Sequence, residues 1–179
     1  EALREDARAF NIIASPGYPE LIDNMVSLNN DRRNTAFVIG DTSMRLAATS
    51  TAIQNWASNS AADTGNSEDA LVTADEYLGI FYPPGQTNDL SGNTIVVPAS
   101  HMILRTIARS DDQSFPWFAP AGTRRGLVDN ANAIGFINSA TGEFQVDNVR
   151  ESLRDTLYSN RINPITFFNG VGLMNYGQK

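Results

Sequence analysis

Short apolar runs alternate with amphipathic stretches through the first half of the chain. Residues 12–14 and 36–39 are continuous apolar runs, and turn-forming residues follow each of them. Continuous rather than alternating runs are typical of parallel strands that helices cover on both faces. Between the two runs, apolar residues from Pro19 to Leu28 recur at three- and four-residue steps, which predicts a helix. The order strand, helix, strand favours a parallel sheet.

The pattern continues with further helices and strands. Apolar positions in the later segments again recur at helical spacing, and turn-rich stretches separate them. For the first of these helices, residues 41–43 are suitable caps. We therefore predict helices over 46–57, 98–109 and 146–157, strands over 77–82, 165–168 and 172–175, and loops over about 58–75 and 84–94.

Together these elements predict one α/β domain over residues 1–179, built as a three-layer α/β/α core with a mostly parallel sheet. A chain of 179 residues is long enough to bury a substantial core. Its 41% hydrophobic and 18% charged residues exclude a disordered chain.

Charge and composition narrow the range of partners. Thirteen Lys and Arg against twenty Asp and Glu give a formal charge of −7, which repels phosphate backbones and anionic lipid. We therefore expect no nucleic-acid partner and no membrane partner. The absence of cysteine excludes disulfides and thiolate metal sites. The first residues lack an initiator Met and a signal-peptide pattern, so the chain is expected to come from a longer protein.

Candidate catalytic residues are few. The chain has one histidine, His101, which follows Ser100 near the predicted helix start, and it has no Gly-x-Ser-x-Gly turn. Asp41 directly follows a predicted strand, where open α/β sheets place ligand contacts. A hydrolase using Asp41, His101 and Ser100 is one alternative, but we favour a helix cap for Asp41 and a helix-start position for His101.

Binding sites for cofactors are not indicated. Glycine-rich phosphate loops are absent from the sequence, and the acidic pairs 68–69 and 111–112 lack the ligand spacing of a calcium loop. We predict no cofactor and no metal. A flavodoxin-like ligand-binding module, using the loops after residues 39 and 82, is the other alternative. Arg124 and Arg125 either bind carboxylates of a partner or balance local acids.

Two segments have a more specific residue order. Residues 115–126 read Phe-Pro-Trp-Phe-Ala-Pro-Ala-Gly-Thr-Arg-Arg-Gly, which resembles the Pro-Trp-x-Ala-Pro-Ala-Gly-x-x-Arg-Gly signature of contractile phage tail sheath proteins. Residues 157–179 resemble, in the same order, the helix, Ile-Asn-Pro strand and Gly-Gln-Lys/Arg turn of that family. Prolines stiffen such a loop, and Trp117 and Phe118 offer large areas for burial, which suits a docking surface.

The resemblance implies a structural role rather than an enzyme. It implies a core of subtilisin-like shape without proteolytic activity, in a subunit that polymerises around a tail tube and contracts to deliver a genome or effectors. The implied partners are copies of the chain, the tube protein and the baseplate. The implied location is the virion tail, assembled in the cytoplasm of a host bacterium. In that family an N-terminal arm and a C-terminal domain flank the core and join neighbouring subunits. Because the family continues past the Gly-Gln-Lys/Arg turn, the resemblance also implies that the predicted strand over 172–175 lies near an unpaired edge of the sheet in this chain.

The resemblance also directs attention to surface arginines. It implies that a helix near the end of the core faces the tube. The predicted contacts with the tube or with neighbouring subunits are Arg150, Arg154, Arg161, Arg124 and Arg125.

Overall fold

The structure is a computed structural model that describes residues 2–5, 8–58, 68, 70–71, 73–115 and 117–179. Within these residues the main sheet has five strands. Their order is β1 (Ile12–Ala14), β2 (Phe37–Asp41), β3 (Leu78–Tyr82), β8 (Ile162–Phe168) and β9 (Gly172–Asn175). Strands β1, β2, β3 and β8 are parallel, and β9 is antiparallel to β8.

The predicted α/β class is confirmed, but the main sheet is mixed rather than mostly parallel. Strands β8 and β9 form a hairpin through residues 169–171, in which Gly170 has a φ of 81°. A connection this short joins antiparallel neighbours, because a parallel return needs a crossover of about a dozen residues or more. The last strand therefore reverses the direction of the sheet at one edge.

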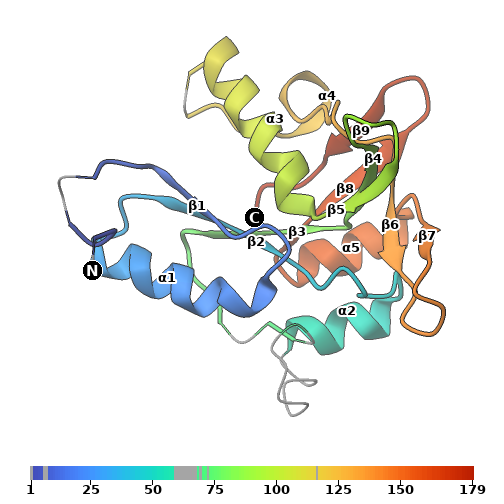
Figure 1. Ribbon diagram of the computed structural model, residues 1–179, viewed down its shortest axis with the longest axis horizontal. Coiled ribbons are helices and arrows are strands. Elements are labelled where there is room, and N and C mark those ends of the chain that lie inside the picture. The colour runs from blue at the N-terminus through green and yellow to red at the C-terminus, as the bar shows by residue number, and fades with distance from the viewer. Residues whose placement is uncertain (1, 6–7, 59–67, 69, 72, 116) are drawn as a thin grey trace.

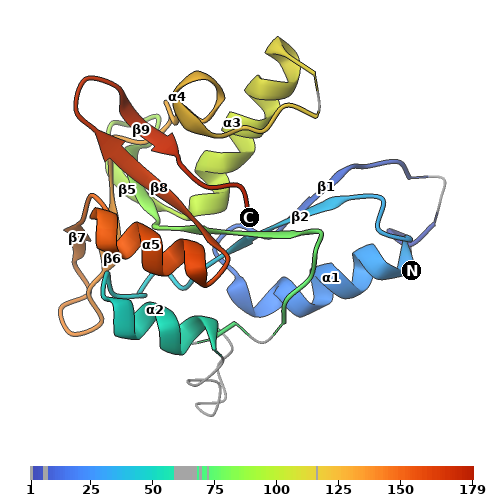
Figure 2. The same ribbon diagram turned by 180° about the vertical axis from the view of Figure 1, so that it is seen from behind.

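Helices cover both faces of the main sheet (Figures 1 and 2). One face carries α1 (Ile22–Asp31), α2 (Ser50–Ala57) and α5 (Glu151–Ser159), and the other carries α3 (Ala99–Gln113). A 3₁₀ turn, η1 (Pro19–Leu21), leads into α1. Because side chains alternate along a strand, Gly40 in β2 lies against Ile22 of α1, whereas Asp41 contacts the start of α3.

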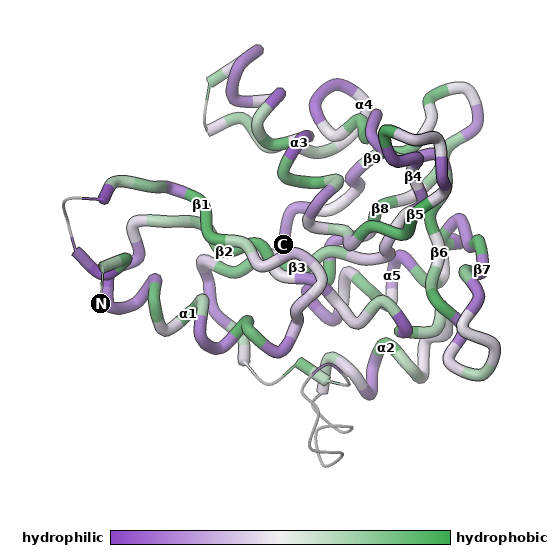
Figure 3. The backbone as a smooth tube through the Cα atoms, viewed as in Figure 1, coloured by the Kyte–Doolittle hydropathy of each residue, from purple (hydrophilic) through white to green (hydrophobic). Residues whose placement is uncertain are grey.

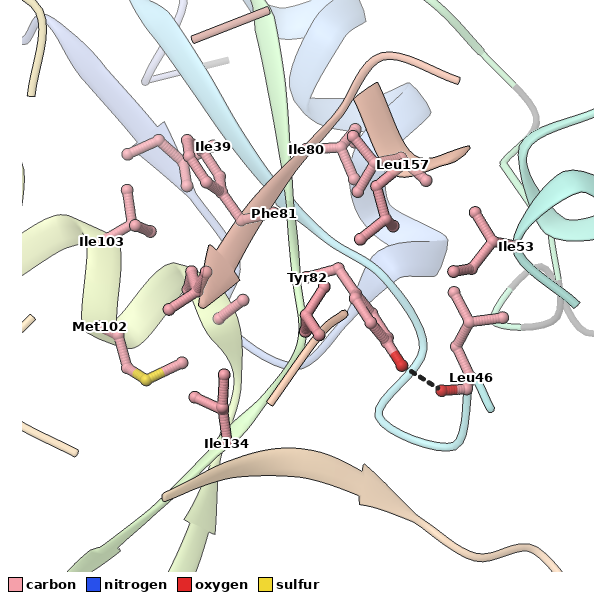
Figure 4. Close-up of a cluster of buried hydrophobic side chains, with 14 of the residues drawn as sticks. Ile39, Leu46, Ile53, Ile80, Phe81, Tyr82, Met102, Ile103, Ile134 and Leu157 are labelled. Atoms are coloured by element: carbon pink, nitrogen blue, oxygen red, sulfur yellow. Dashed lines mark hydrogen bonds between the residues drawn. The ribbon is translucent and has the colours of Figure 1, made fainter. Parts of the chain in front are cut away.

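The hydrophobic core lies between the main sheet and its helices (Figure 4). On one face, the fully buried Tyr82 and Leu157 belong to this core, and on the other face Phe81 lies towards Ile103. The hydroxyl of Tyr82 donates to the backbone carbonyl of Leu46 at 3.1 Å, so this polar group is satisfied inside the core. In Figure 3 the strands β1, β2 and β3 are largely hydrophobic, whereas hydrophobic and hydrophilic residues alternate along α1.

A second sheet was not predicted. Its order is β5 (Thr94–Val97), β4 (Gly85–Asn88), β6 (Ala133–Ile137) and β7 (Phe144–Val146), and all its pairs are antiparallel. The predicted loop over about 84–94 is therefore only partly correct, because it contains strand β4 and the first residue of β5. Residues 85–88 pair with β5, residues 85 and 86 also pair with β6, and the remaining turn lies at 89–93.

Several predicted helix boundaries also differ from the structure. Helix α2 begins at Ser50 rather than at residue 46. Helix α3 continues to Gln113 instead of ending before residue 110. Helix α5 begins at Glu151, because Val146 ends strand β7 and Val149 has a φ of 53°, which interrupts any helix through this position. The apolar spacing from 146 to 157 thus joins two different elements.

Three further predictions concern caps and loops. Helix α2 is capped by the side chain of Thr49, which accepts from the backbone N–H of Ala52 at 3.3 Å, and not by residues 41–43. The two arginines placed in a loop form part of a short helix, α4 (Gly122–Arg125). The predicted loop over about 58–75 falls largely outside the described residues.

Candidate functional site

An exposed group of aromatic rings follows α3. Phe115, Trp117 and Phe118 have exposed fractions of 63%, 76% and 42%. The first two rings stack with centroids 5.3 Å apart and planes 3° apart, and Trp117 lies 5.8 Å from Phe118. Much of the burial area that these rings offer is therefore left uncovered by the described residues. Aromatic surface that is exposed in a contiguous group is typical of an interaction site.

Two arginines border these rings. The guanidinium of Arg125 lies 5.5 Å from the centre of the Phe118 ring, a geometry for a cation–π contact. Among the described residues, Arg124 and Arg125 form no ion pair. Their charge is thus available to a partner. We call Phe115, Trp117, Phe118, Arg124 and Arg125 the aromatic–arginine patch.

The segment after the patch attaches it to the main sheet. The side-chain amide of Asn175 donates to the carbonyl of Pro120 at 2.8 Å, and its backbone N–H donates to Gly126 at 2.7 Å. The N–H of Val128 donates to Leu173 at 2.8 Å. Residues 126–128 therefore pair with the outer edge of β9, so the predicted unpaired edge at 172–175 is partly covered.

The same segment is also attached to α3. The carboxylate of Asp129 accepts from Arg105 at 2.8 Å and from Arg109 at 2.9 Å. The hydroxyl of Thr106 lies 3.3 Å from the carbonyl of Leu127. Hydrogen bonds from two elements thus hold residues 126–129 in place. As a result, the aromatic–arginine patch sits on a rigid base.

The three arginines near α5 do not form one cluster. Arg150 and Arg161 are exposed and lie just before and just after the helix, roughly 15 Å apart at 1.5 Å per residue. Arg154 is half-buried. Its guanidinium lies 5.2 Å from the ring centre of Phe168 and 5.6 Å from that of Tyr176. Arg154 therefore packs against the β8–β9 hairpin.

The acid, serine and histidine of the hydrolase alternative lie near one another, but in a capping arrangement. Asp41 is 2% exposed and Ser100 is 0% exposed. One carboxylate oxygen of Asp41 accepts from the backbone N–H of Ser100 at 2.6 Å, and the other accepts from its hydroxyl at 2.7 Å and from the N–H of Gly17 at 2.8 Å. Asp41 thus caps α3, a later helix than predicted.

The ionisation of Asp41 reflects its surroundings. Burial raises the pKa of the Asp41 carboxyl above its ordinary value, while the hydrogen bonds from Gly17 and Ser100 and the nearby His101 oppose this rise. His101 is exposed in the first turn of α3, as predicted. The hydroxyl of Ser100 donates to Asp41 rather than to an imidazole. This geometry supports a structural role for the three residues.

The described part of the chain has neither a candidate metal site nor a helix that could span a membrane. No group of three or more His, Cys, Asp or Glu side chains there could hold a metal ion. No helix among the described residues has the length and apolar character needed to cross a bilayer.

Comparison with known proteins identifies the family that the chain resembles. No family model matches the chain. The tail sheath protein of Vibrio phage KVP40 is 36% identical to it over 83 residues, which are 46% of this chain and 11% of that relative. The resemblance to tail sheath proteins is confirmed. The tail sheath protein of Enterobacteria phage T4 is 34% identical over 83 residues, which are again 46% of this chain and 11% of that relative.

Solved sheath structures share the fold. The contracted helical sheath of the anti-feeding prophage matches 95% of this chain and 39% of its own chain, with a TM-score of 0.63 and 17% identity. A chain of the anti-feeding prophage baseplate matches 95% of this chain and 37% of its own length, with a TM-score of 0.61 and 16% identity. The sheath fold therefore extends over nearly the whole chain. The chain itself spans well under half of the length of these relatives.

Sequence reasoning about the sheath resemblance missed two residues that position the patch. Gly126 and Asn175 are 49 positions apart in the sequence, and their contact joins the patch to β9. A Cβ at Gly126 would lie 2.5 Å from the carbonyl oxygen of Asn175, so the pairing requires glycine here. The final Gly of the 115–126 motif was a signal for this close approach, but its partner could not be identified.

Proposed function

We propose that this chain is part of a structural subunit of a contractile tail sheath, which polymerises around a tail tube and contracts to drive genome or effector delivery. The observation that carries this proposal is the 36% identity to a phage tail sheath protein over 83 residues. The sheath fold over 95% of the chain supports it. In this proposal the chain is not an enzyme, and the subtilisin-like shape of its three-layer core carries no activity.

The partners follow from the same proposal. They are other copies of the subunit, the tube protein and the baseplate, in a virion tail assembled in the cytoplasm of a bacterial host. The exposed aromatic–arginine patch supports a protein partner, because exposed aromatic and arginine side chains are enriched at protein interfaces. The formal charge of −7 argues against nucleic acid and anionic membrane as partners.

Contraction in this proposal uses no bound nucleotide. Subunits move as rigid bodies between two packings, and the energy is stored in the less stable packing before contraction. A rigid core suits this role. Its β9 edge is tied to α3 through residues 126–129, so that force is transmitted between the sheet and the helix that covers it.

Electron microscopy of the complete subunit expressed with its tube protein tests the proposal. We expect hollow sheaths of regular helical symmetry around tubes. Soluble subunits that never assemble, in the presence of well-formed tubes, would contradict the proposal. Assembly must depend on the tube, so the subunit without tube protein serves as the comparison.

We also propose that Arg150 and Arg161, exposed at the two ends of α5, contact the tube. Replacing both with Glu should reduce assembly around tubes while leaving the unfolding transition unchanged, because surface charges contribute little to folding. Replacement of the exposed Arg8 and Arg33 with Glu makes the same change in charge and is the control. If both double variants assemble equally well, Arg150 and Arg161 do not contact the tube.

A further inference from the structure

A hollow beside α5 has chemistry opposite to that of the aromatic–arginine patch. Its volume is about 440 Å³. The carboxylates of Glu151 and Asp155 border it, one turn apart on α5, and both residues are exposed. The rings of Tyr158 and Tyr176 are 42% and 52% exposed. We call this surface the α5 hollow, and its lining residues are Glu151, Arg154, Asp155, Tyr158, Pro164 and Tyr176.

The carboxylates of the α5 hollow lack cationic partners within the described part of the chain. Two cations lie nearby, but both face aromatic rings. Arg154 lies over the rings of Phe168 and Tyr176, and the ammonium of Lys179 lies 4.0 Å from the centre of the Tyr158 ring. The hollow therefore offers two free carboxylates beside aromatic and proline surface.

The two surfaces are complementary in charge and in apolar character. The patch has exposed aromatic rings and two arginines, and the hollow has two carboxylates beside two tyrosines. None of these four charged groups forms an ion pair with another described residue. We propose that the aromatic–arginine patch of one copy of this chain docks into the α5 hollow of a second copy. Arg124 and Arg125 then face Glu151 and Asp155, and Trp117 enters the hollow.

This contact is head-to-tail, because the two surfaces are different parts of the molecule. A docked pair keeps a free patch on one copy and a free hollow on the other, so docking continues from copy to copy. A chain of net charge −7 repels copies of itself. The arginines of the patch offset this repulsion at this contact.

The size of the patch predicts a weak pairwise contact. At 150–250 Å² per ring, the exposed parts of its three aromatic side chains amount to roughly 300–450 Å². A stable interface takes about 800 Å² from each partner. One contact thus supplies about half of the buried area that a lasting dimer needs. Many repeated contacts together can stabilise an assembly. The inference rests on the proposed sheath function, which supplies a second copy as the partner.

Tryptophan fluorescence can detect the contact directly. The chain has two tryptophans. Trp56 is 2% exposed and Trp117 is 76% exposed, so quenching by acrylamide reports mainly on Trp117. We expect this quenching to fall as the chain is concentrated from the micromolar to the millimolar range. The Trp117→Phe variant, which keeps an aromatic ring, gives the Trp56 background to subtract.

Charge exchange between the surfaces is the decisive test. Reversing the patch (Arg124→Glu with Arg125→Glu) or reversing the hollow (Glu151→Arg with Asp155→Arg) should weaken association at least tenfold. Mixing the two variants should restore protection of Trp117, because their reversed charges again attract. The matched controls are Arg8→Glu with Arg33→Glu, and Glu20→Arg with Asp23→Arg, which change the net charge equally at exposed positions elsewhere.

Three outcomes would overturn the inference: quenching of Trp117 that does not depend on concentration, equal effects of controls and test variants, or a mixture that stays unassociated. Circular dichroism of each variant confirms that it is folded. The proposed function is tested separately by microscopy of the complete subunit. Sheaths that form normally from subunits with a reversed patch would leave the function standing and remove this contact.

Discussion

The carboxylate of Asp41 receives both the backbone N–H and the hydroxyl of Ser100, at 2.6 and 2.7 Å, across 59 positions of sequence. The same carboxylate receives the N–H of Gly17 at 2.8 Å. One buried side chain at the end of β2 thus joins the turn after β1 to the start of α3. A negative charge at this end of a helix is also favoured by the helix dipole.

Replacing Asp41 with Ala should lower the free energy of unfolding by about 2–4 kcal/mol, because the buried N–H and hydroxyl of Ser100 and the part-buried N–H of Gly17 lose their acceptor. Urea unfolding measures this change. The exposed Asp23 on α1 is the control, and Asp23→Ala should change the free energy by less than about 0.5 kcal/mol. Equal stability of the two variants would show that the Asp41 hydrogen bonds contribute nothing net.

Asp41 should also give stability a pH dependence of defined sign. Burial raises the pKa of its carboxyl in the folded state above the ordinary value of 3.8. The folded chain therefore binds this proton more readily than the unfolded chain does. Its contribution to stability is fully present below pH 3.8 and is lost as the pH rises through the raised folded-state pKa.

The Asp41→Asn variant isolates this contribution, because its amide does not titrate. The difference in unfolding free energy between wild type and variant, measured from neutral pH downwards, should shift in favour of the wild type on acidification. The other carboxylates titrate in both proteins, so their contributions cancel in the difference between the two unfolding free energies. A difference that is constant with pH, or that moves the other way, would show that the folded-state pKa of Asp41 is not raised.

Replacing Gly126 with Ala should separate residues 126–128 from β9. The added Cβ would lie 2.5 Å from the carbonyl oxygen of Asn175, a backbone atom that cannot rotate away. We expect a loss of about 1–3 kcal/mol in unfolding free energy and faster hydrogen exchange at the amides of Val128 and Asn175. Gly92→Ala is the control, since it strains a hairpin turn with open space around it. Unchanged exchange in Gly126→Ala would mean that the edge adapts.

Asn163 should hold the last residues of the chain in place. Its side-chain amide donates to the carbonyls of Ile80 at 3.1 Å and Lys179 at 2.6 Å, and its oxygen accepts from the N–H of Lys179 at 2.6 Å. Asn163→Ala should cost about 1–3 kcal/mol of stability and increase the mobility of residues 177–179 in NMR relaxation. The exposed Asn169→Ala is the control. Rigid terminal residues in Asn163→Ala would contradict this role.

The sequence by itself determined the elements whose signal is local. Strands β2, β3 and β9 and helices α1 and α3 lie where apolar runs or helical spacing predicted them, because burial imposes a period on each segment. The order of the residues in 115–126 and 157–179 also sufficed to indicate the sheath family. Both kinds of information are contained within single stretches of the chain.

Tertiary structure decided which segments meet. Strand β4 reads Gly-Gln-Thr-Asn, which has no strand signal of its own, and it is a strand because β5 and β6 pair with it. The acceptor that caps α3, the cover of the β9 edge and the exposure of Trp117 likewise depend on residues far apart in sequence. The spacing of residues within one segment does not predict such distant partners, because burial and hydrogen bonding are completed only when the elements pack together.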